Sequence, residues 1–355
     1  MQNNRVNRLL GKLEEAGLDG FLISSPCNRR YFSGFSGSNG LLLISRTTQL
    51  LSTDFRYWEQ AANEAPGLTL YKAAKGLKEW FASFVEQAGV SRLGFESKDI
   101  TVDTRNVMRR ALKKDGVHTK MIAAGDLCDQ LRTVKDDRET ALIRQAAAIS
   151  DAAAEYARQI AHAGMTEIEL AWEIESHMRQ NGSEPVSFSV ICASGPNSAL
   201  PHAKPTQRSI NPGEPIVLDF GACAGGYTSD LTRTIYCEEP DSQFKKLYNI
   251  VLSAQQAAIE KIRSGMKASE ADAIARSVIQ NAGYGDYFGH SVGHGIGLEV
   301  HEAPFLGPSS KDTLEEGMVF TIEPGIYLPG WGGIRIEDDA LLQNNGVVLL
   351  SKATK

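Results

Sequence analysis

One segment in the last third of the chain gathers histidine and glycine residues. Its sequence, His290-Ser-Val-Gly-His-Gly-Ile-Gly-Leu-Glu-Val-His-Glu302, holds His290, His294 and His301 among the 7 histidines of the protein. Histidine is the commonest side-chain metal ligand and the usual general acid or base near neutral pH. Glycines at this density indicate backbone that packs closely against another segment. The alternative is a glycine-rich loop with solvent-facing histidines, so acidic partners elsewhere in the chain must decide.

A first pair of carboxylates lies in two apolar runs that a glycine turn separates. Asp219 interrupts the run 216–220, and Asp230 opens a second run after Ala224-Gly-Gly. Aspartate is depleted in strands, and a buried unpaired carboxylate is costly. A turn centred at 224/225 would place Asp219 directly opposite Asp230 across a hairpin. Directly opposed like charges repel each other, so this pair requires a cation.

The same pattern recurs near the C-terminus. Glu323 ends the apolar run 319–322, Glu337 lies in the run 334–342, and the turn cluster Leu328-Pro-Gly-Trp-Gly-Gly separates them. A turn centre near residue 330 sets these two carboxylates opposite each other as well. For either hairpin alone, a salt-bridged or surface acidic pair is an equally good interpretation. Two such hairpins together with the histidine segment favour a metal site.

Charge counting predicts how many ions this site holds. Asp219, Asp230, Glu323 and Glu337 carry four negative charges, and a neutral His294 adds none, so two divalent cations would neutralise the set. A ligand set rich in oxygen with a single imidazole suits Mn²⁺ first, with Co²⁺, Zn²⁺ or Fe²⁺ as alternatives. Two such ions roughly 3.5–4 Å apart can activate a water molecule and polarise a carbonyl group. The expected chemistry is hydrolytic.

Length and composition limit the class of protein. A chain of 355 residues exceeds what one hydrophobic core usually organises, so we expect two domains. The formal net charge of −6 and the pI near 5.7 argue against nucleic-acid and anionic-membrane partners. The N-terminus lacks an apolar signal region, and no run is long enough to span a membrane, which makes a cytoplasmic location the expectation. The 5 cysteines include no Cys-x-x-Cys pair, which disfavours a disulfide framework and structural zinc.

The N-terminal part alternates helical and strand patterns. Helices are expected over 5–16, 77–87 and 105–114, and strands over 18–24, 40–45, 49–52 and 91–95. The two middle strands flank Arg46-Thr-Thr, which indicates a hairpin. This pattern predicts an α/β domain over residues 1–128. The motifs at 31–40 and 53–57 admit two interpretations, ordinary turn chemistry or a loop that reaches a neighbouring active site.

The remaining residues, 129–355, are expected to form an α+β domain with an antiparallel-rich sheet. Helices are predicted over 139–161, 167–181, 243–262 and 270–282, the second opened by a capping box at Thr166 and the fourth capped by Ser269 with Asp272. Strands are predicted over 186–192, 215–222, 231–237, 318–322 and 334–342.

These residues together resemble the "pita-bread" metallopeptidases, in the proline-peptidase branch of aminopeptidase P and prolidase. The segment 290–302 matches the signature of that branch, and the likeness covers nearly the whole chain in its short, bacterial two-domain form. The motifs at 31–38 and 53–57 are similar to the aminopeptidase P side of the branch. The resemblance implies an N-terminal creatinase/prolidase-like α/β domain for substrate access and dimer contacts, a C-terminal pita-bread α+β catalytic domain, and a homodimer.

The resemblance also implies a role for each site residue. The metal ligands would be Asp219, Asp230, His294, Glu323 and Glu337. His202 would stabilise the tetrahedral intermediate or move protons, and His301 would lie near the scissile carbonyl and the leaving proline. His290 and Tyr327 would line the substrate pocket, His290 with a catalytic role as well, and Arg335 would be a catalytic residue beside the metal ligands. Because Arg335 precedes Glu337 by two residues on one strand face, it could instead simply anchor that carboxylate.

The resulting hypothesis is a dinuclear metallopeptidase that removes the N-terminal residue from small peptides with proline second. Prolidases that accept only dipeptides resemble one another in an arginine after the His-Glu pair, whereas residues 303–313 here contain only Lys311. This difference favours an Xaa-Pro aminopeptidase over the alternative, an Xaa-Pro dipeptidase. A third possibility is an inactive pita-bread binding protein, although relatives of that kind would have lost at least one ligand.

Overall fold

The computed structural model describes residues 2–185 and 188–355 of the chain. The chain divides into two compact units, Met1–Arg132 and Thr133–Lys355. The expected boundary after residue 128 falls inside helix α6 (Leu127–Arg132), the last element of the first unit. In the described part of the chain, every helix is too short or too polar to cross a membrane.

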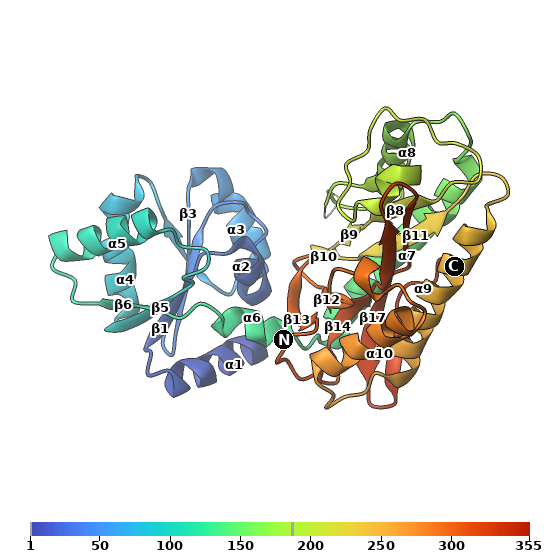
Figure 1. Cartoon of the computed structure of the whole chain (residues 1–355). Helices are drawn as coiled ribbons and strands as arrows, with labels where there is room; N and C mark the ends of the chain where they lie inside the picture. The colour runs from blue at the N-terminus through green and yellow to red at the C-terminus, as the bar shows by residue number, and fades with distance from the viewer. Residues whose placement is uncertain (1, 186–187) are drawn as a thin grey trace. The chain divides into compact units, whose positions relative to one another are not determined.

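The N-terminal unit is an α/β domain built around one sheet, with strand order β4-β3-β2-β1-β5-β6 (Figure 1). Its strands are β1 (Gly20–Ile23), β2 (Leu41–Ser45), β3 (Gln49–Thr53), β4 (Thr69–Lys72), β5 (Arg92–Phe95) and β6 (Lys120–Ala123). Its other helices are α1 (Gln2–Glu15), α2 (Pro26–Ser33), the 3₁₀ helix η1 (Phe55–Tyr57), α3 (Trp58–Glu64), α4 (Leu77–Ala88) and α5 (Val102–Lys114).

The predicted hairpin of this unit is confirmed, because β2 pairs antiparallel with β3 and Leu42 lies opposite Leu51. The strand β1 pairs in parallel with β5, as expected where helices alternate with strands. The sequence patterns missed α2, α3, α6, β4 and β6. The strand β4 is only half-buried and β6 has one buried residue, so neither shows the apolar pattern that marks a core strand.

The two motifs that could have reached another site contact each other within this unit. The buried guanidinium of Arg29 donates hydrogen bonds to the carbonyl oxygens of Ser24, Gly37 and Gly40, at 3.0, 2.6 and 2.9 Å. Asn39 donates to the carboxylate of Asp54 at 2.6 Å, which ties the first motif to the second. These contacts give both motifs a structural role inside the unit, and the idea that they reach a neighbouring active site stays a prediction.

The C-terminal unit combines antiparallel sheets with two pairs of long helices. Its helices are α7 (Asp137–Ile160), α8 (Glu167–Gln180), η2 (Gly195–Ala199), α9 (Ser242–Lys261), α10 (Ala268–Asn281) and η3 (Gly285–Tyr287). Its strands are β7 (Ile191–Ser194), β8 (Ile216–Phe220), β9 (Cys223–Ala224), β10 (Tyr227–Thr228), β11 (Leu231–Ile235), β12 (Gly293–Gly295), β13 (Glu302–Leu306), β14 (Val319–Ile322), β15 (Gly325–Leu328), β16 (Gly332–Arg335), β17 (Asp338–Gln343) and β18 (Gly346–Leu349).

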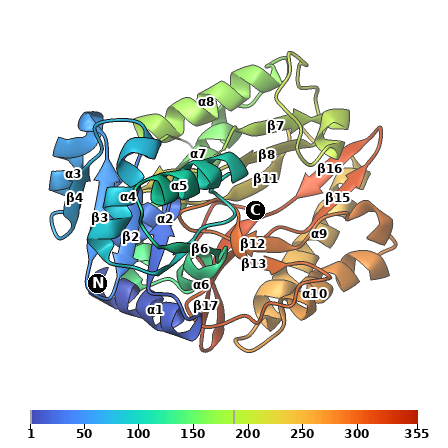
Figure 2. The same ribbon diagram turned by 90° about the vertical axis from the view of Figure 1, so that its left-hand side faces the viewer.

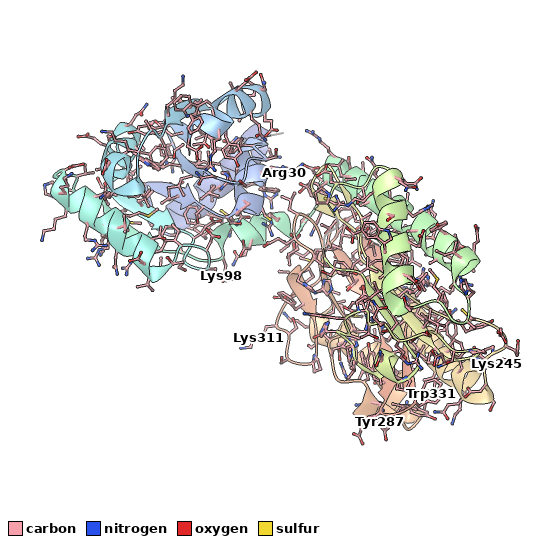
Figure 3. The ribbon with its side chains drawn as sticks, turned by 90° about the horizontal axis from the view of Figure 1, so that it is seen from above. Arg30, Lys98, Lys245, Tyr287, Lys311 and Trp331 are labelled. Atoms are coloured by element: carbon pink, nitrogen blue, oxygen red, sulfur yellow. The ribbon has the colours of Figure 1, made fainter. Side chains whose placement is uncertain are left out.

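The strands of this unit lie between the two helix pairs (Figure 2). Helices α7 and α8 pack on the sheet β11-β8-β7 and share one hydrophobic core with it. Helices α9 and α10 share a second core with strands of the sheet β13-β12-β14-β17-β18 and of the β15–β16 hairpin. Charged side chains such as Lys245 and Lys311 project outward from this unit (Figure 3). The predicted α+β domain is therefore confirmed.

Local signals placed most of these helices, with one error at α10. The capping box at Thr166 is present, because Thr166 and Glu169 exchange side-chain-to-backbone hydrogen bonds at the start of α8. The expected cap of α10 by Ser269 and Asp272 is wrong, since the helix already begins at Ala268, after Lys267. Asp272 instead lies buried in the helix and forms an ion pair with Arg276.

Two predicted strands also differ from the structure. The run 334–342 is split into β16 and β17, with Glu337 in the break between them. The strand expected over 186–192 is observed as β7, which begins at Ile191, while residues 186 and 187 lie outside the described part of the chain.

The glycines of the histidine segment permit the close backbone approach that their density indicated. A Cβ atom on Gly293 would overlap the carbonyl oxygen of Thr321 on β14, and one on Gly295 would overlap that of Ala303 on β13. Gly289, in the same segment, has no atom within 4 Å of the position of a Cβ. Packing therefore requires Gly293 and Gly295 inside β12, which let the strand that carries His294 fit between its neighbours. It also restricts Gly297, where a Cβ atom would overlap the side chain of Glu302.

We expect the Gly293→Ala variant to destabilise the C-terminal unit by about 1–3 kcal/mol, because the new methyl group must push β12 away from β14. Urea denaturation compared with the wild-type protein measures this change. Gly289→Ala is the matched control and should unfold at the wild-type midpoint or slightly above it, because alanine restricts the unfolded chain. Equal midpoints for the two variants would contradict the packing argument.

Candidate functional site

A cavity of about 400 Å³ in the C-terminal unit brings the predicted site residues together. Its polar lining includes His202, Asp219, Asp230, His290, His294, His301, Glu323, Arg335 and Glu337. Its apolar lining consists of Phe188, Ile191, Pro201, Val300 and Phe305. No sequence pattern singles out these apolar residues, because each is an ordinary apolar position whose place on a cavity wall depends on the fold. Tyr327 is absent from this lining and lies behind His290 and Arg335.

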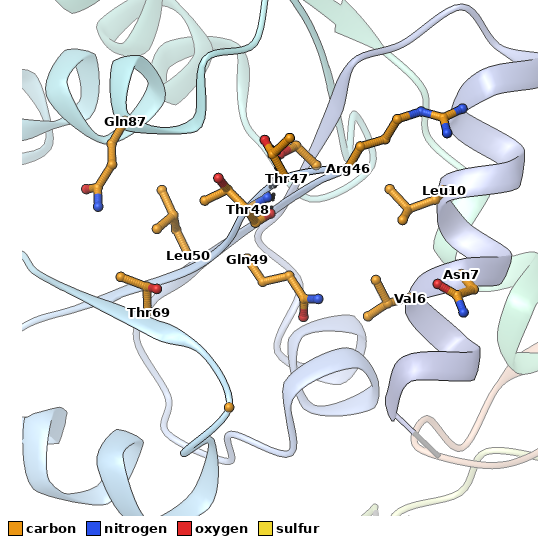
Figure 4. A pocket seen from close by; sticks show the side chains of 12 residues that line it. Val6, Asn7, Leu10, Arg46, Thr47, Thr48, Gln49, Leu50, Thr69 and Gln87 are labelled. Atoms are coloured by element: carbon orange, nitrogen blue, oxygen red, sulfur yellow. Dashed lines mark hydrogen bonds between the residues drawn. The ribbon is translucent and has the colours of Figure 1, made fainter.

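Two clefts on the N-terminal unit are larger, at about 450 and 560 Å³, but their side chains do not suit this chemistry. The smaller one lies between α1 and the β2–β3 hairpin, and its lining has neither a carboxylate nor an imidazole (Figure 4). The other is lined by basic residues of α5 and by Lys120 of β6, again without a carboxylate. A choice of site by cavity volume alone would therefore select a cleft without carboxylates and miss the cavity in the C-terminal unit.

The first acidic pair does not lie where the predicted turn would put it. The turn is centred between Gly225 and Gly226, both with positive φ, so Asp219 on β8 lies opposite Thr232 on β11 and not opposite Asp230. This register corrects the expected turn centre at 224/225. Because Asp230 precedes Thr232 by two residues, it shares the sheet face of Thr232 and is a diagonal neighbour of Asp219.

The second acidic pair follows the predicted register. The β14–β17 ladder pairs Ile322 with Asp338, and the β15–β16 ladder pairs Gly325 with Arg335. Both ladders have the same turn centre at residue 330, and this register places Glu323 opposite Glu337 in the gap between them. Main-chain amides are released from the ladder in this gap, and the Glu337 amide donates to the carbonyl oxygen of Thr232 at 3.1 Å. The gap joins the second hairpin to the first.

The other four predicted ligands lie around His294. Ligand atoms of Asp230, His294 and Glu337 lie within 4.8 Å of one another. The His294 Nε2 atom lies 3.7 Å from Asp230 Oδ2 and 3.4 Å from Glu323 Oε1. The fifth residue, Asp219, lines the same cavity. One cluster is thus formed by residues on β8 and β12, directly before β11, directly after β14 and between β16 and β17.

The protonation of His294 leaves its Nε2 lone pair directed into this cluster. The Nδ1 atom lies 3.1 Å from the carbonyl oxygen of Gly295, and a carbonyl oxygen only accepts, so Nδ1 carries the proton. Burial lowers the pKa of His294, which favours the neutral ring with an unprotonated Nε2. A lone pair facing carboxylate oxygens is repulsive unless a cation lies between them.

The carboxylates also show that a cation fits. The Oδ1 atoms of Asp219 and Asp230 are buried and accept no hydrogen bond from the described residues. Burial raises the pKa of Asp230 and of Glu337 well above the usual range, and the negative charges of neighbouring carboxylates raise them further. Burial also raises the pKa of Glu323. Two orphaned oxygens, crowded carboxylates and one free imidazole nitrogen suit divalent cations with mixed oxygen and nitrogen ligands.

Arg335 compensates part of this negative charge. Its Nη2 donates to Asp219 Oδ2 at 2.6 Å and its Nε donates to Thr232 Oγ1 at 3.0 Å. Strand alternation suggests that Arg335 anchors Glu337. In the structure, Arg335 instead anchors Asp219 on the neighbouring hairpin. Although burial opposes the charge, Tyr327 and the surrounding carboxylates raise the pKa of Arg335 well above its usual range. The charge count from sequence had left this cation out.

His290 is held through Tyr327 in the same network. Its Nδ1 lies 2.8 Å from the carbonyl oxygen of Ser291, so Nδ1 is the donor and Nε2 accepts the Tyr327 hydroxyl proton at 2.9 Å. The Tyr327 oxygen in turn accepts from Arg335 Nη1 at 2.8 Å. Burial lowers the pKa of His290 and raises that of Tyr327 to about 12, which keeps both groups neutral. Both ring nitrogens of His290 are thus engaged, and neither is left to move a proton for a substrate.

The other two histidines remain accessible. His202 and His301 are exposed on the cavity lining, and the ring centroid of His301 lies 4.3 Å from that of His294. The cavity wall removes part of the water around the His301 ring, and this partial desolvation lowers its pKa, as does the neighbouring His294. They line the same cavity as the predicted metal ligands, together with Val300 and Phe305, and their contact with a substrate stays a prediction.

Sequence reasoning missed residues that position the ligands. Thr232 donates to Glu337 Oε2 at 2.6 Å. Thr321 accepts the His294 amide at 3.1 Å and donates to Glu323 Oε1 at 3.3 Å. The buried carboxylate of Asp339 accepts the amide of Asp230 at 3.1 Å. A signal existed for all three, because each lies two residues from a predicted ligand on the same strand face.

The fold and this cluster define a two-domain metallohydrolase. The sequence profile named "Metallopeptidase family M24" matches residues 141–344, and the profile "Creatinase/Prolidase N-terminal domain" matches residues 5–134. The chain therefore belongs to metallopeptidase family M24 and is a hydrolase. The resemblance to pita-bread peptidases that the sequence motifs indicated is confirmed.

Three relatives illustrate the likeness. An Xaa-Pro dipeptidase of Pyrococcus horikoshii is 36% identical over 100% of this chain and 99% of its own length. The structure of an Xaa-Pro dipeptidase from Bacillus anthracis matches with a TM-score of 0.95 and 41% identity, over 100% of this chain and 99% of that one. The structure of an X-Pro aminopeptidase from Thermotoga maritima matches with a TM-score of 0.91 and 38% identity, over 98% of both chains.

The raised pKa values predict a stability profile for the metal-free protein. A carboxylate whose pKa is higher in the folded state binds more protons there, so stability falls as the pH rises toward that folded value. The buried histidines act in the opposite direction, but only below their unfolded pKa of about 6.5. Above the unfolded carboxylate pKa of about 4 we therefore expect the carboxylates to make the free energy of unfolding in chelator decrease as the pH rises, by up to about 1.4 kcal/mol per pH unit for each carboxylate still protonated. Above about pH 6.5 no histidine opposes this decrease.

Thermal unfolding measured across this range, with and without saturating Mn²⁺, checks the profile. Metal should remove the decrease, because bound cations favour the ionised carboxylates. Asp230→Asn should flatten the metal-free profile, whereas Asp286→Asn, on the short helix η3 outside the cluster, should leave it unchanged. A metal-free wild-type protein whose stability depends on pH in the same way as that of Asp230→Asn would contradict the assignment.

Proposed function

We propose that this protein is an Xaa-Pro dipeptidase that depends on divalent metal ions. The observation that carries the proposal is the cluster of four carboxylates around the unprotonated Nε2 of His294, two of which have orphaned buried oxygens. Support for the substrate comes from relatives that align along their full length and are named Xaa-Pro dipeptidase or prolidase. Asp219, Asp230, His294, Glu323 and Glu337 would hold the ions.

Divalent ions bound there would supply Lewis-acid activation of water and of the scissile carbonyl. The chain's own residues would do the remaining work. Arg335 and Thr232 hold Asp219 and Glu337 in position, through the hydrogen bonds of 2.6 Å that each makes. His202 and His301, exposed on the lining, would donate hydrogen bonds to the substrate and move protons to the leaving proline nitrogen. Val300 and Phe305 would contact the proline ring.

The length of the substrate decides between the two Xaa-Pro activities. The sequence favours the aminopeptidase, because residues 303–313 lack an arginine that could hold the proline carboxylate. The names of the relatives favour the dipeptidase instead. Lys311 does not replace that arginine, since it is exposed and does not line the cavity. Among the described lining residues, the imidazoles of His202 and His301 and the hydroxyl of Ser291 are donors left for such a carboxylate, because Arg335 is engaged with Asp219.

The aminopeptidase remains the second candidate, favoured by this lack of an arginine and by the full-length likeness to the X-Pro aminopeptidase of Thermotoga maritima. The preference for Mn²⁺, the number of ions, the homodimer and the cytoplasmic location stay predictions. The binding-protein alternative is disfavoured, because membership of the metallopeptidase family is accompanied by the complete set of predicted ligands on one cavity.

We expect chelator-treated protein to lose hydrolysis of Ala-Pro and to regain it with Mn²⁺ or Co²⁺. Restored enzyme should prefer Ala-Pro to Ala-Pro-Ala by about 10–100-fold in kcat/KM, because a charge-assisted hydrogen bond to the free proline carboxylate contributes about 1.5–3 kcal/mol. Ala-Gly, a dipeptide without proline, is the control for the specificity of the bond.

Three outcomes separate the candidates. Equal or faster cleavage of Ala-Pro-Ala would replace the dipeptidase by the aminopeptidase. Failure of every divalent ion to restore cleavage of either peptide would refute both activities. Cleavage of Ala-Gly as fast as Ala-Pro would show that proline is not recognised.

A further inference from the structure

The segment 288–292 presents His290 to the cavity and leads into the strand that carries His294. It lies between η3 and β12 and belongs to neither a helix nor a strand. A backbone segment of this kind has no regular ladder to fix its path, so other groups must satisfy its polar atoms. The next residue, Gly293, approaches Thr321 too closely for any side chain, which leaves β12 little room to shift.

A single arginine on α10 binds two carbonyl groups of this segment. Arg276 Nη1 donates to the carbonyl oxygen of Phe288 at 2.9 Å, and Arg276 Nη2 donates to that of His290 at 2.7 Å. The planar guanidinium with its fixed donors suits two acceptors at defined positions, which a lysine cannot reproduce. Arg276 therefore fixes the segment on both sides of Gly289.

Asp272, one turn earlier on α10, completes the arrangement. Its carboxylate accepts from Arg276 Nε at 2.7 Å and from Nη2 at 2.8 Å, which orients the guanidinium. The Oδ1 atom also accepts the amide of Val292 at 3.0 Å, an amide shared with the carbonyl oxygen of Leu306 on β13. The aspartate side chain is 1% exposed and that of Arg276 is 17% exposed. This partly buried pair thus binds the main chain at three points.

A second set of contacts reaches the imidazole of His290 itself. The guanidinium carbon of Arg276 lies 4.3 Å from the centroid of the Phe288 ring. That ring meets the ring of His290 edge-on, with the centroids 5.0 Å apart and an interplanar angle of 89°. Arg276 therefore contacts His290 in two ways. It binds the carbonyl oxygen of His290 directly, and it packs on the ring of Phe288, which in turn contacts the imidazole.

We propose that the Asp272–Arg276 ion pair is a positioning device for the metal centre, which fixes the path of residues 288–292 so that His290 and His294 face the cluster. The pair touches no cavity-lining carboxylate and acts only through other groups. This role rests on the proposed function, because it matters for activity only if His294 binds a metal. The role expected for Asp272 from its sequence position, a helix cap together with Ser269, would leave Arg276 unexplained.

The experiment compares Arg276→Met and Arg276→Lys with the wild-type full-length protein by three measurements. These are hydrogen–deuterium exchange of peptides covering 288–296, the affinity for Mn²⁺ by calorimetry, and kcat and KM for Ala-Pro. We expect Arg276→Met to raise local exchange, to weaken Mn²⁺ binding by about 10–100-fold, and to lower kcat more than it changes KM. Arg276→Lys keeps the charge beside Asp272 but cannot reach both carbonyl groups, so intermediate values are expected.

Arg179→Met is the matched control, because Arg179 pairs with Glu175 at the same i,i+4 spacing on the surface of α8. It should behave like the wild-type protein in all three measurements. Arg276→Lys provides the test if Arg276→Met does not fold. Wild-type exchange and Mn²⁺ affinity in the folded variants would overturn the proposal.

Failure of the proposed function would appear differently, as a wild-type protein that binds Mn²⁺ without cleaving Ala-Pro or that does not bind it at all. In that case the exchange of peptides 288–296 in the Arg276 variants still decides whether the pair positions the segment. Exchange raised throughout the C-terminal unit, and not in 288–296 above the rest, would show general destabilisation and would also overturn the positioning role.

Discussion

Mutual repulsion among buried carboxylates is the constraint on which this structure depends. Asp219, Asp230, Glu323 and Glu337 line one cavity around an imidazole whose unprotonated nitrogen faces them. A protein gains no stability from such a group of like charges out of water, because both desolvation and repulsion oppose it. Among the described residues that line the cavity, Arg335 is the one permanent cation, and it is engaged with Asp219. The remaining charge is balanced by bound cations or by protons, and this need connects the fold to its chemistry.

The architecture of the C-terminal unit holds these charges together from outside. Two helix pairs with separate cores cover strands that meet along the site. Buried polar side chains then link the strands, as Gln255 of α9 does by donating to the carbonyl oxygens of Ile322 and Ile336 at 3.0 and 3.3 Å. These two carbonyl groups belong to the residues directly before Glu323 and Glu337. The ligands are thus positioned by groups that lie one step away from the cavity.

Much of the site could be read from residue types and spacing, and the errors have identifiable causes. Period-two spacing and turn residues placed Glu323 opposite Glu337, because a proline–glycine turn fixes the register of a hairpin. The same reasoning misplaced Asp230, since consecutive Gly225 and Gly226 allow turn centres one residue apart and a shift of one residue changes every cross-strand partner. Arg335 was expected beside Glu337 on its own strand, yet it reaches Asp219 on the adjacent sheet, a contact that depends on how the two hairpins pack.

The sequence by itself determined the chemical identity of this protein: four carboxylates and a histidine in apolar or glycine-rich runs, an α/β domain followed by an α+β domain, and a family signature at 290–302. These features are local, because they follow from residue type, periodicity and turn chemistry over short distances. Only the tertiary structure decided which residues position the ligands, that both nitrogens of His290 are engaged, and that Asp272 pairs with Arg276 instead of capping a helix. The first two depend on segments far apart in the chain, whose meeting is set by the packing of the whole unit. The Asp272–Arg276 pair is local on α10, but the main-chain groups of 288–292 that it binds come from another segment.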